Sequence, residues 1–201
     1  MIGPAAEAEI IAEQLGLNRT SAEILAAYVE LIEELGTDDV SMKLIARRAG
    51  VGERTIFRHY ATRTDLLLGA ASWADRVVFA RPDYDSVFDL PLALRQTMTA
   101  YGQRPDLAFL VAEAMMRGAA GTDPAPSREH LERLLWQEIP DLQEDERRSV
   151  LAALCHLDSA GTWVALQREF GMAVHDIADA AAWSAEAILN PLRSRTGAHH
   201  G

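Results

Sequence analysis

The sequence has a single cysteine, no long apolar run and few basic residues for its length. Cys155 alone cannot form an intrachain disulfide, so a chain of 201 residues that is 49% hydrophobic must fold around an apolar core. The sequence has no uninterrupted apolar stretch of about 18 residues, the length that spans a membrane. Its N-terminus also lacks the basic and apolar regions of a secretory signal. We therefore expect a cytoplasmic protein.

Convincing strand-type alternation, internal repeats and low-complexity tracts are also lacking. Apolar residues recur instead with helical spacing, and the pattern predicts an all-α protein of about nine helices. A capping box, Thr20 with Glu23, predicts the start of a helix that Gly36 ends. Ser41 and Gly50 bracket a short helix, and a second capping box, Thr62 with Asp65, precedes a helix that Pro82 ends. Further helices are predicted at about 89–103, 105–118, 127–138, 142–170 and 174–192, with an additional turn or two within 7–16.

Basic residues are scarce but concentrated. The chain has a formal net charge of −11, yet residues 41–64 contain six Lys and Arg side chains and only one carboxylate, Glu53, which leaves +5. A uniformly acidic protein would be repelled by a polyanion. The basic segment therefore predicts a local, directed contact with DNA.

The same segment has the spacing of a helix-turn-helix. Two closely crossing helices need a small residue at the crossing, a turn residue that tolerates positive φ, and buried aliphatic residues on the second helix. Ala46, Gly50 and Ile56 meet these needs in order. Ile45, Ala49 and Val51 complete the apolar face.

Three motifs follow one another in the chain: Ile45-Ala46-x-x-Ala49-Gly50-Val51, Thr55-Ile56-Phe57-x-His59-Tyr60 and Arg63-x-Asp65-Leu66-Leu67. With them the chain resembles the TetR (tetracycline-repressor-like) family over about residues 18–70. The resemblance implies a homodimeric transcriptional regulator, usually a repressor, whose C-terminal domain binds a small ligand and releases DNA. On this basis we expect an N-terminal extension (1–17), a DNA-binding domain (18–65), an effector-binding and dimerisation domain (66–193) and a tail (194–201).

A recognition helix presents its N-terminal residues to base edges. Arg54, Thr55, Arg58 and His59 are the candidates for reading sequence, and Gly52 would allow close backbone approach. Ser41, Lys43, Tyr60 and Arg63 are better placed for phosphate. Arg47 and Arg48 fit a solvated helix face as well as phosphate contact. Glu53 either stabilises the helix N-terminus, the interpretation we favour, or accepts a hydrogen bond from cytosine.

One helix-turn-helix reads half a site, so dimerisation is expected. Small and aliphatic residues at helical spacing favour an interface built from 149–170 and 177–189, and periodicity alone leaves an intrachain core as the alternative. Bulky apolar residues elsewhere could line a mainly apolar effector cavity. These candidates are Trp73, Met98, Tyr101, Phe109, Met115, Met116, Trp136 and Trp163.

Catalytic, metal and cofactor sites are not predicted. Cys155, His156 and Asp158 are too close in one helix for their side chains to converge as a nucleophile, a base and an orienting group. His130, the pair His175 and Asp176, and the terminal His199 and His200 lack metal-ligand spacing. The alternatives to a repressor are an activator and a helical interaction protein that binds no specific DNA.

Overall fold

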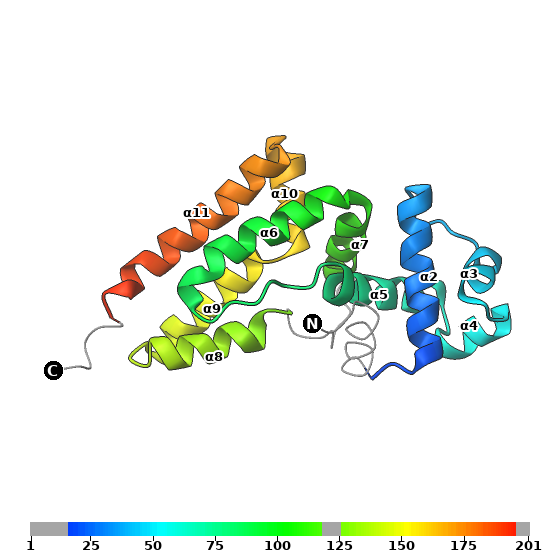
Figure 1. Cartoon of the computed structure of the whole chain (residues 1–201), viewed down its shortest axis with the longest axis horizontal. Coiled ribbons are helices and arrows are strands. Elements are labelled where there is room, and N and C mark those ends of the chain that lie inside the picture. The colour runs from blue at the N-terminus through cyan, green and yellow to red at the C-terminus, as the bar shows by residue number, and fades with distance from the viewer. Residues whose placement is uncertain (1–15, 118–125, 196–201) are drawn as a thin grey trace. The chain divides into compact units, whose positions relative to one another are not determined.

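The computed structural model describes residues 16–117 and 126–195, which contain ten α-helices and no strand (Figure 1). The prediction of an all-α fold is confirmed. The chain divides into two compact units. Unit 1 is formed by Met1–Ala80 with Arg104–Ala119, and unit 2 by Arg81–Gln103 with Ala120–Gly201. The segment 7–16, most of the tail and the histidines at 199 and 200 lie outside the described residues.

Unit 1 is organised around its longest helix, whose buried stripe includes Ile24, Tyr28, Leu31 and Ile32. The helices and the π-helical turn of this unit are α2 (Arg19–Leu35), α3 (Met42–Ala49), α4 (Glu53–His59), α5 (Arg63–Trp73), η1 (Ala74–Val78) and α7 (Pro105–Met116). Helix α2 packs against α3, α5 and α7. The short α3 and α4 are therefore supported by one long helix.

Helix ends in unit 1 follow local sequence signals, with one correction. Gly36 and Gly50 end α2 and α3 at φ values of 64° and 69°, a conformation that favours glycine. The Thr62–Asp65 capping box is present at the start of α5. The predicted box at Thr20 is wrong, because Asn18 caps α2 by accepting a hydrogen bond from the Ser21 amide.

Unit 2 is built on two long helices, α6 and α11, which run antiparallel and side by side (Figure 1). Its elements are η2 (Val87–Asp89), α6 (Leu90–Gln103), α8 (Arg128–Glu138), α9 (Glu144–Leu157), α10 (Ala160–Phe170) and α11 (Val174–Arg193). The single helix predicted over 142–170 is wrong. It is divided into α9 and α10 because Ser159 adopts an extended conformation and its hydroxyl accepts from the Thr162 amide, which starts a new helix.

The apolar face of α11 is directed into unit 2. Helix α11 makes its most extensive contact with α6. Its buried residues are Ile177, Ala178, Ala181, Ala182, Ala185, Leu189 and Leu192. These residues are therefore part of the core of unit 2, which was the alternative to a subunit interface. Any contact with a second subunit must use the opposite face of α11.

No single helix within the described residues has the length and hydropathy to cross a membrane. Helices α9 and α10 reach the required length and composition only as a pair, and they are bent by 63°.

A glycine sets the close approach of α6 to α11. A Cβ atom added at Gly102 would overlap the side chain of Val174, whereas one added at Gly161 would meet only the Ser159 hydroxyl, at 3.6 Å. Small residues at a helix crossing allow backbones to approach. Gly102 therefore fixes the spacing at which α11 closes the core of unit 2.

We expect Gly102→Ala to lower the free energy of unfolding by about 1 to 3 kcal/mol, because the added methyl group must displace Val174. The matched control is Gly161→Ala, which also adds a methyl group within a helix and should be neutral or stabilising by up to about 1 kcal/mol. Urea unfolding of both variants gives the comparison. Equal effects of the two substitutions would contradict this role for Gly102.

Candidate nucleic-acid interface

Helices α3 and α4 form the helix-turn-helix predicted from the sequence. The Val51 amide donates to the Ala46 carbonyl oxygen at 3.0 Å and closes the turn behind Gly50. Ile45, Ala46 and Ile56 are buried beneath the turn. The two helices are therefore fixed to each other through apolar contacts on one side, which leaves the other side exposed.

Four basic side chains occupy exposed positions on these two helices. Lys43 and Arg47 belong to α3, and Arg54 and Arg58 belong to α4. None of the four is in an ion pair with the part of the chain that the structure describes. Their charges are therefore available to a partner outside the chain.

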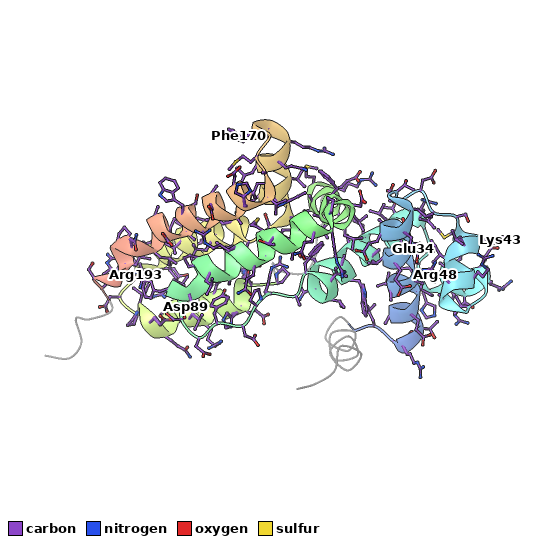
Figure 2. The ribbon with its side chains drawn as sticks, turned by 45° about the horizontal axis from the view of Figure 1, so that its top comes forward. Glu34, Lys43, Arg48, Asp89, Phe170 and Arg193 are labelled. Carbon is purple, nitrogen blue, oxygen red and sulfur yellow. The ribbon has the colours of Figure 1, made fainter. Side chains whose placement is uncertain are left out.

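Arg48 is engaged inside the protein. Its guanidinium binds Glu34 through two hydrogen bonds of 2.8 and 2.6 Å and reaches Glu30 at 3.3 Å. Figure 2 shows Arg48 and Glu34 facing each other between α3 and α2, whereas Lys43 points away from α2. The guanidinium holds the pKa of Glu34 below its usual range. Arg48 thus joins α3 to α2, and its charge is largely neutralised.

Arg63 is also occupied, at the loop that enters α3. Its guanidinium donates to the carbonyl oxygens of Val40 at 3.0 Å and Asp38 at 2.7 Å, and to the Asp39 carboxylate at 3.2 Å. The Tyr28 hydroxyl donates to the same Asp38 carbonyl at 2.8 Å. In this arrangement Arg63 orders the loop before Ser41, which caps α3 by accepting from the Leu44 amide.

His59 and Tyr60, expected at a base edge and at phosphate, face α2 instead. His59 Nδ1 lies 2.9 Å from the Ser21 hydroxyl, and its Nε2 is buried. The Tyr60 hydroxyl donates to the Ser21 carbonyl oxygen at 3.3 Å, and burial raises the pKa of Tyr60 to about 12. Both residues therefore hold the C-terminal end of α4 against α2.

The N-terminal end of α4 is left open. Gly52 caps the helix without a side-chain hydrogen bond, and Glu53 lies in the first turn, where a carboxylate is favourable next to the positive end of the helix dipole. Thr55 is half-buried. Phe57 is 49% exposed, so about half of its surface is not used for packing within the chain.

Residues 24–70 match the family model of bacterial regulatory proteins of the tetR family. The match covers both helices and the turn between them. This segment therefore has the helix-turn-helix of the tetR family, and the match supports a DNA-binding regulator.

Solved structures agree with this regulator in fold. A TetR transcriptional regulator from Rhodococcus sp. RHA1 is 20% identical, with a TM-score of 0.59 over 90% of this chain and 98% of its own. A TetR variant from Acinetobacter baumannii AYE in complex with minocycline is 18% identical, with a TM-score of 0.55 over 89% of this chain and 97% of its own. BioQ with its double-stranded DNA operator is 20% identical, with a TM-score of 0.52 over 81% of this chain and 98% of its own. No curated protein shows a significant sequence match to the chain.

The eight effector-site candidates are divided between the two units. Trp73, Phe109, Met115 and Met116 belong to unit 1, and Met98, Tyr101, Trp136 and Trp163 to unit 2. Trp73, Met98, Tyr101 and Trp163 are buried. Met115, Met116 and Trp136 are exposed, and Trp136 stacks under the Arg147 guanidinium, whose carbon lies 3.7 Å from the ring centroid. Phe109 lines a pocket of about 210 Å³ within unit 1.

The Cys155 segment has a geometry that does not suit nucleophilic catalysis. His156 is exposed, whereas Asp158 is buried and paired with Arg81. Burial raises the pKa of the Cys155 thiol to about 11. Within the described residues, no group of three or more His, Cys, Asp or Glu side chains is arranged to hold a metal ion.

Sequence reasoning missed the residues that neutralise or anchor the basic segment. Ser21, Glu30, Glu34 and Asp38 all precede the helix-turn-helix in the chain. Their contacts join residues 10 to 39 positions apart. The excess of carboxylates on α2 was the one signal in the sequence, because these side chains have to face either water or nearby cations.

We expect Arg63→Ala to lower the free energy of unfolding of the protein by about 1 to 2 kcal/mol, because the Val40 carbonyl oxygen loses the Arg63 donor and the Asp38 carbonyl oxygen keeps only its other donors, which include the Tyr28 hydroxyl. Arg63→Lys should recover part of the loss, since a lysine keeps the positive charge but has one nitrogen in place of the two guanidinium nitrogens that reach Val40 and Asp38. Thermal unfolding monitored by circular dichroism measures both. An unchanged Arg63→Ala variant would show that the loop is ordered without this side chain.

Proposed function

We propose that this regulator is a sequence-specific repressor that leaves a pseudo-palindromic operator when a small ligand binds. The observation that carries the proposal is the set of four exposed, unpaired cations on α3 and α4 in a chain of net charge −11. Such a distribution favours DNA at one face and repels it elsewhere. The alternatives are an activator and a protein that uses the same helices for protein contact. Action in the cytoplasm, by binding without catalysis, is part of the proposal.

Contacts with DNA are assigned from exposure. Arg54 and Arg58, which are exposed on α4, and Thr55, which is half-buried in the first turn of that helix, are the residues proposed to read bases. Ser41, Lys43 and the Gly52 backbone are proposed to contact phosphate, together with Arg47. His59, Tyr60 and Arg63 act by positioning the helices, a role that their internal hydrogen bonds support.

A homodimer is proposed to form through α9–α10 and the outer face of α11. Trp183 on α11 and Phe170 at the end of α10 are each 70% exposed, unusually large apolar side chains to leave in water. The residues on the inner face of α11 support the core of unit 2 rather than the dimer. Two subunits would present two recognition helices to successive major grooves.

The effector site is proposed to lie in the helical part beyond α5. BioQ, one of the structural neighbours, was solved with its DNA operator, and the Acinetobacter TetR variant was solved with minocycline. These two structures support DNA binding and ligand binding as activities of the fold. Of the candidates, Met98, Tyr101 and Trp163 share unit 2 and are buried, which suits the lining of an enclosed site.

Selection from a random double-stranded DNA library by the purified protein tests the proposal. We expect enrichment of a pseudo-palindrome whose half-sites are separated by about one helical turn. Recovery of no preferred sequence would remove sequence-specific regulation and favour the interaction-protein alternative.

We expect Arg58→Ala and Arg47→Ala to act differently on the selected sequence. Arg58→Ala should reduce discrimination at particular base pairs by about 1 to 3 kcal/mol. Arg47→Ala should weaken selected and random DNA alike and reduce the dependence of affinity on salt concentration. Fluorescence anisotropy with both DNAs at several salt concentrations measures the difference. Identical behaviour of the two variants would refute the assignment of roles.

We expect Trp183→Glu to shift the protein from dimer to monomer, since a carboxylate would be buried at the interface. The control is Leu35→Glu in unit 1, which also charges an exposed apolar position and should leave the dimer intact. Size-exclusion chromatography with light scattering at micromolar concentration reports the mass. A monomeric unmodified protein would overturn the proposed dimer.

A further inference from the structure

One aromatic side chain of the recognition helix is left half in water. Phe57 is the only large apolar side chain of α3 and α4 that is exposed, and the structure describes every residue of these two helices. Within the described residues no ring and no cation stacks on it. A single exposed ring is common on protein surfaces and carries no meaning by itself. Its meaning here depends on what lies next to it.

The place of Phe57 on α4 follows from the buried side chain of that helix. Ile56 is fully buried, so the residues about half a helical turn away from it point outward. Arg54 and Arg58 occupy this outward side, and both are exposed. Phe57 follows Arg54 by three positions, a spacing that makes two side chains neighbours on a helix. The exposed part of the ring therefore borders the surface formed by the two arginines.

These two arginines restrict the partner that can cover the ring. Neither Arg54 nor Arg58 is in an ion pair with the part of the chain that the structure describes. Both are proposed to reach base edges, which brings the whole outward side of α4 into the major groove. Phe57 would enter the groove with them and would meet DNA at the level of the bases.

The chemistry of the ring selects the contact. A phenyl ring has no hydrogen-bonding group, and its negative face does not attract phosphate. Among the groups that base pairs present in the major groove, the C5 methyl group of thymine is the apolar one. The sugars are the other apolar surface of DNA, and a contact with them would not depend on sequence.

We propose that Phe57 determines specificity by packing its exposed part against the C5 methyl group of a thymine, next to base pairs that Arg54 and Arg58 contact. The inference rests on the proposed function, because it names a base that the recognition helix selects. Hydrogen-bonding residues cannot make this distinction, since thymine and uracil differ only in the methyl group.

Replacing thymine with deoxyuridine tests the contact, because it removes the methyl group and keeps the base pair. The palindrome selected by the purified full-length protein is synthesised with this replacement at one thymine of one half-site at a time. Fluorescence anisotropy gives the affinity of each duplex. For the unmodified protein we expect replacement at one position to lower affinity about fourfold, the value of one buried methyl group. Phe57→Ala should bind the thymine and deoxyuridine duplexes equally well.

Two further variants separate this contact from a general loss of binding. Lys43→Ala removes a proposed phosphate contact, so it should weaken both duplexes alike and keep the difference between them. Phe57→Leu retains apolar surface and should keep part of the difference, and it serves as the test variant if Phe57→Ala does not fold. A general loss of affinity cancels, because each variant is compared with itself on two DNAs.

Other results would overturn the inference. A selected palindrome in which no deoxyuridine replacement lowers affinity would refute the thymine contact and leave the proposed regulator intact. A methyl effect that persists in Phe57→Ala would assign the contact to another residue. Equal weakening of selected and random DNA by Phe57→Ala, without a methyl effect, would place the ring against the sugars. Selection of no sequence would refute the proposed function, and this inference with it.

Discussion

The DNA-binding end of this regulator depends on how a very short recognition helix is held. Helix α4 extends only over Glu53–His59, too short to be stable by itself in water. Its one fully buried side chain, Ile56, supplies apolar packing at its centre. The contacts of His59 and Tyr60 with Ser21 fix its C-terminal end to α2. Because all three anchors are on one side, the exposed side of α4 is free to present Arg54 and Arg58.

The anchoring also divides the basic residues by task. Arg48 and Arg63 face carboxylates and carbonyl oxygens of α2 and of the loop before α3, where they stabilise the domain. The remaining cations face outward. A count of charges in the sequence treats all six alike, whereas only those without internal partners contribute fully to attraction for DNA. The effective charge of the DNA-binding face is therefore lower than the sequence suggests, which makes exact placement of each cation more important.

Local signals predicted the helix-turn-helix well, because its turn and caps depend on neighbouring residues. Gly36, Gly50, Ser41 and the Thr62–Asp65 box each act within a few positions of themselves. The misplaced start of α2 shows the limit of such signals. Thr20 and Asn18 are both capping residues two positions apart, and the choice depends on where the chain enters the helix. The division between α9 and α10 has the same origin, since Ser159 is tolerated in a helix but favours capping one.

Contacts between distant segments could not be predicted in this way. The alanines of α11 have the spacing of a close helix contact, but spacing does not say whether the partner is α6 or another subunit. Gly102 decides the matter for the inner face, because it removes the side chain that would keep α11 and Val174 away from α6. Once that face is filled, Trp183 is left on the outside with no role in the fold of unit 2. Exposure of a tryptophan on a helix that is otherwise well packed is costly in water, and this cost is the physical reason for proposing a second subunit at that face.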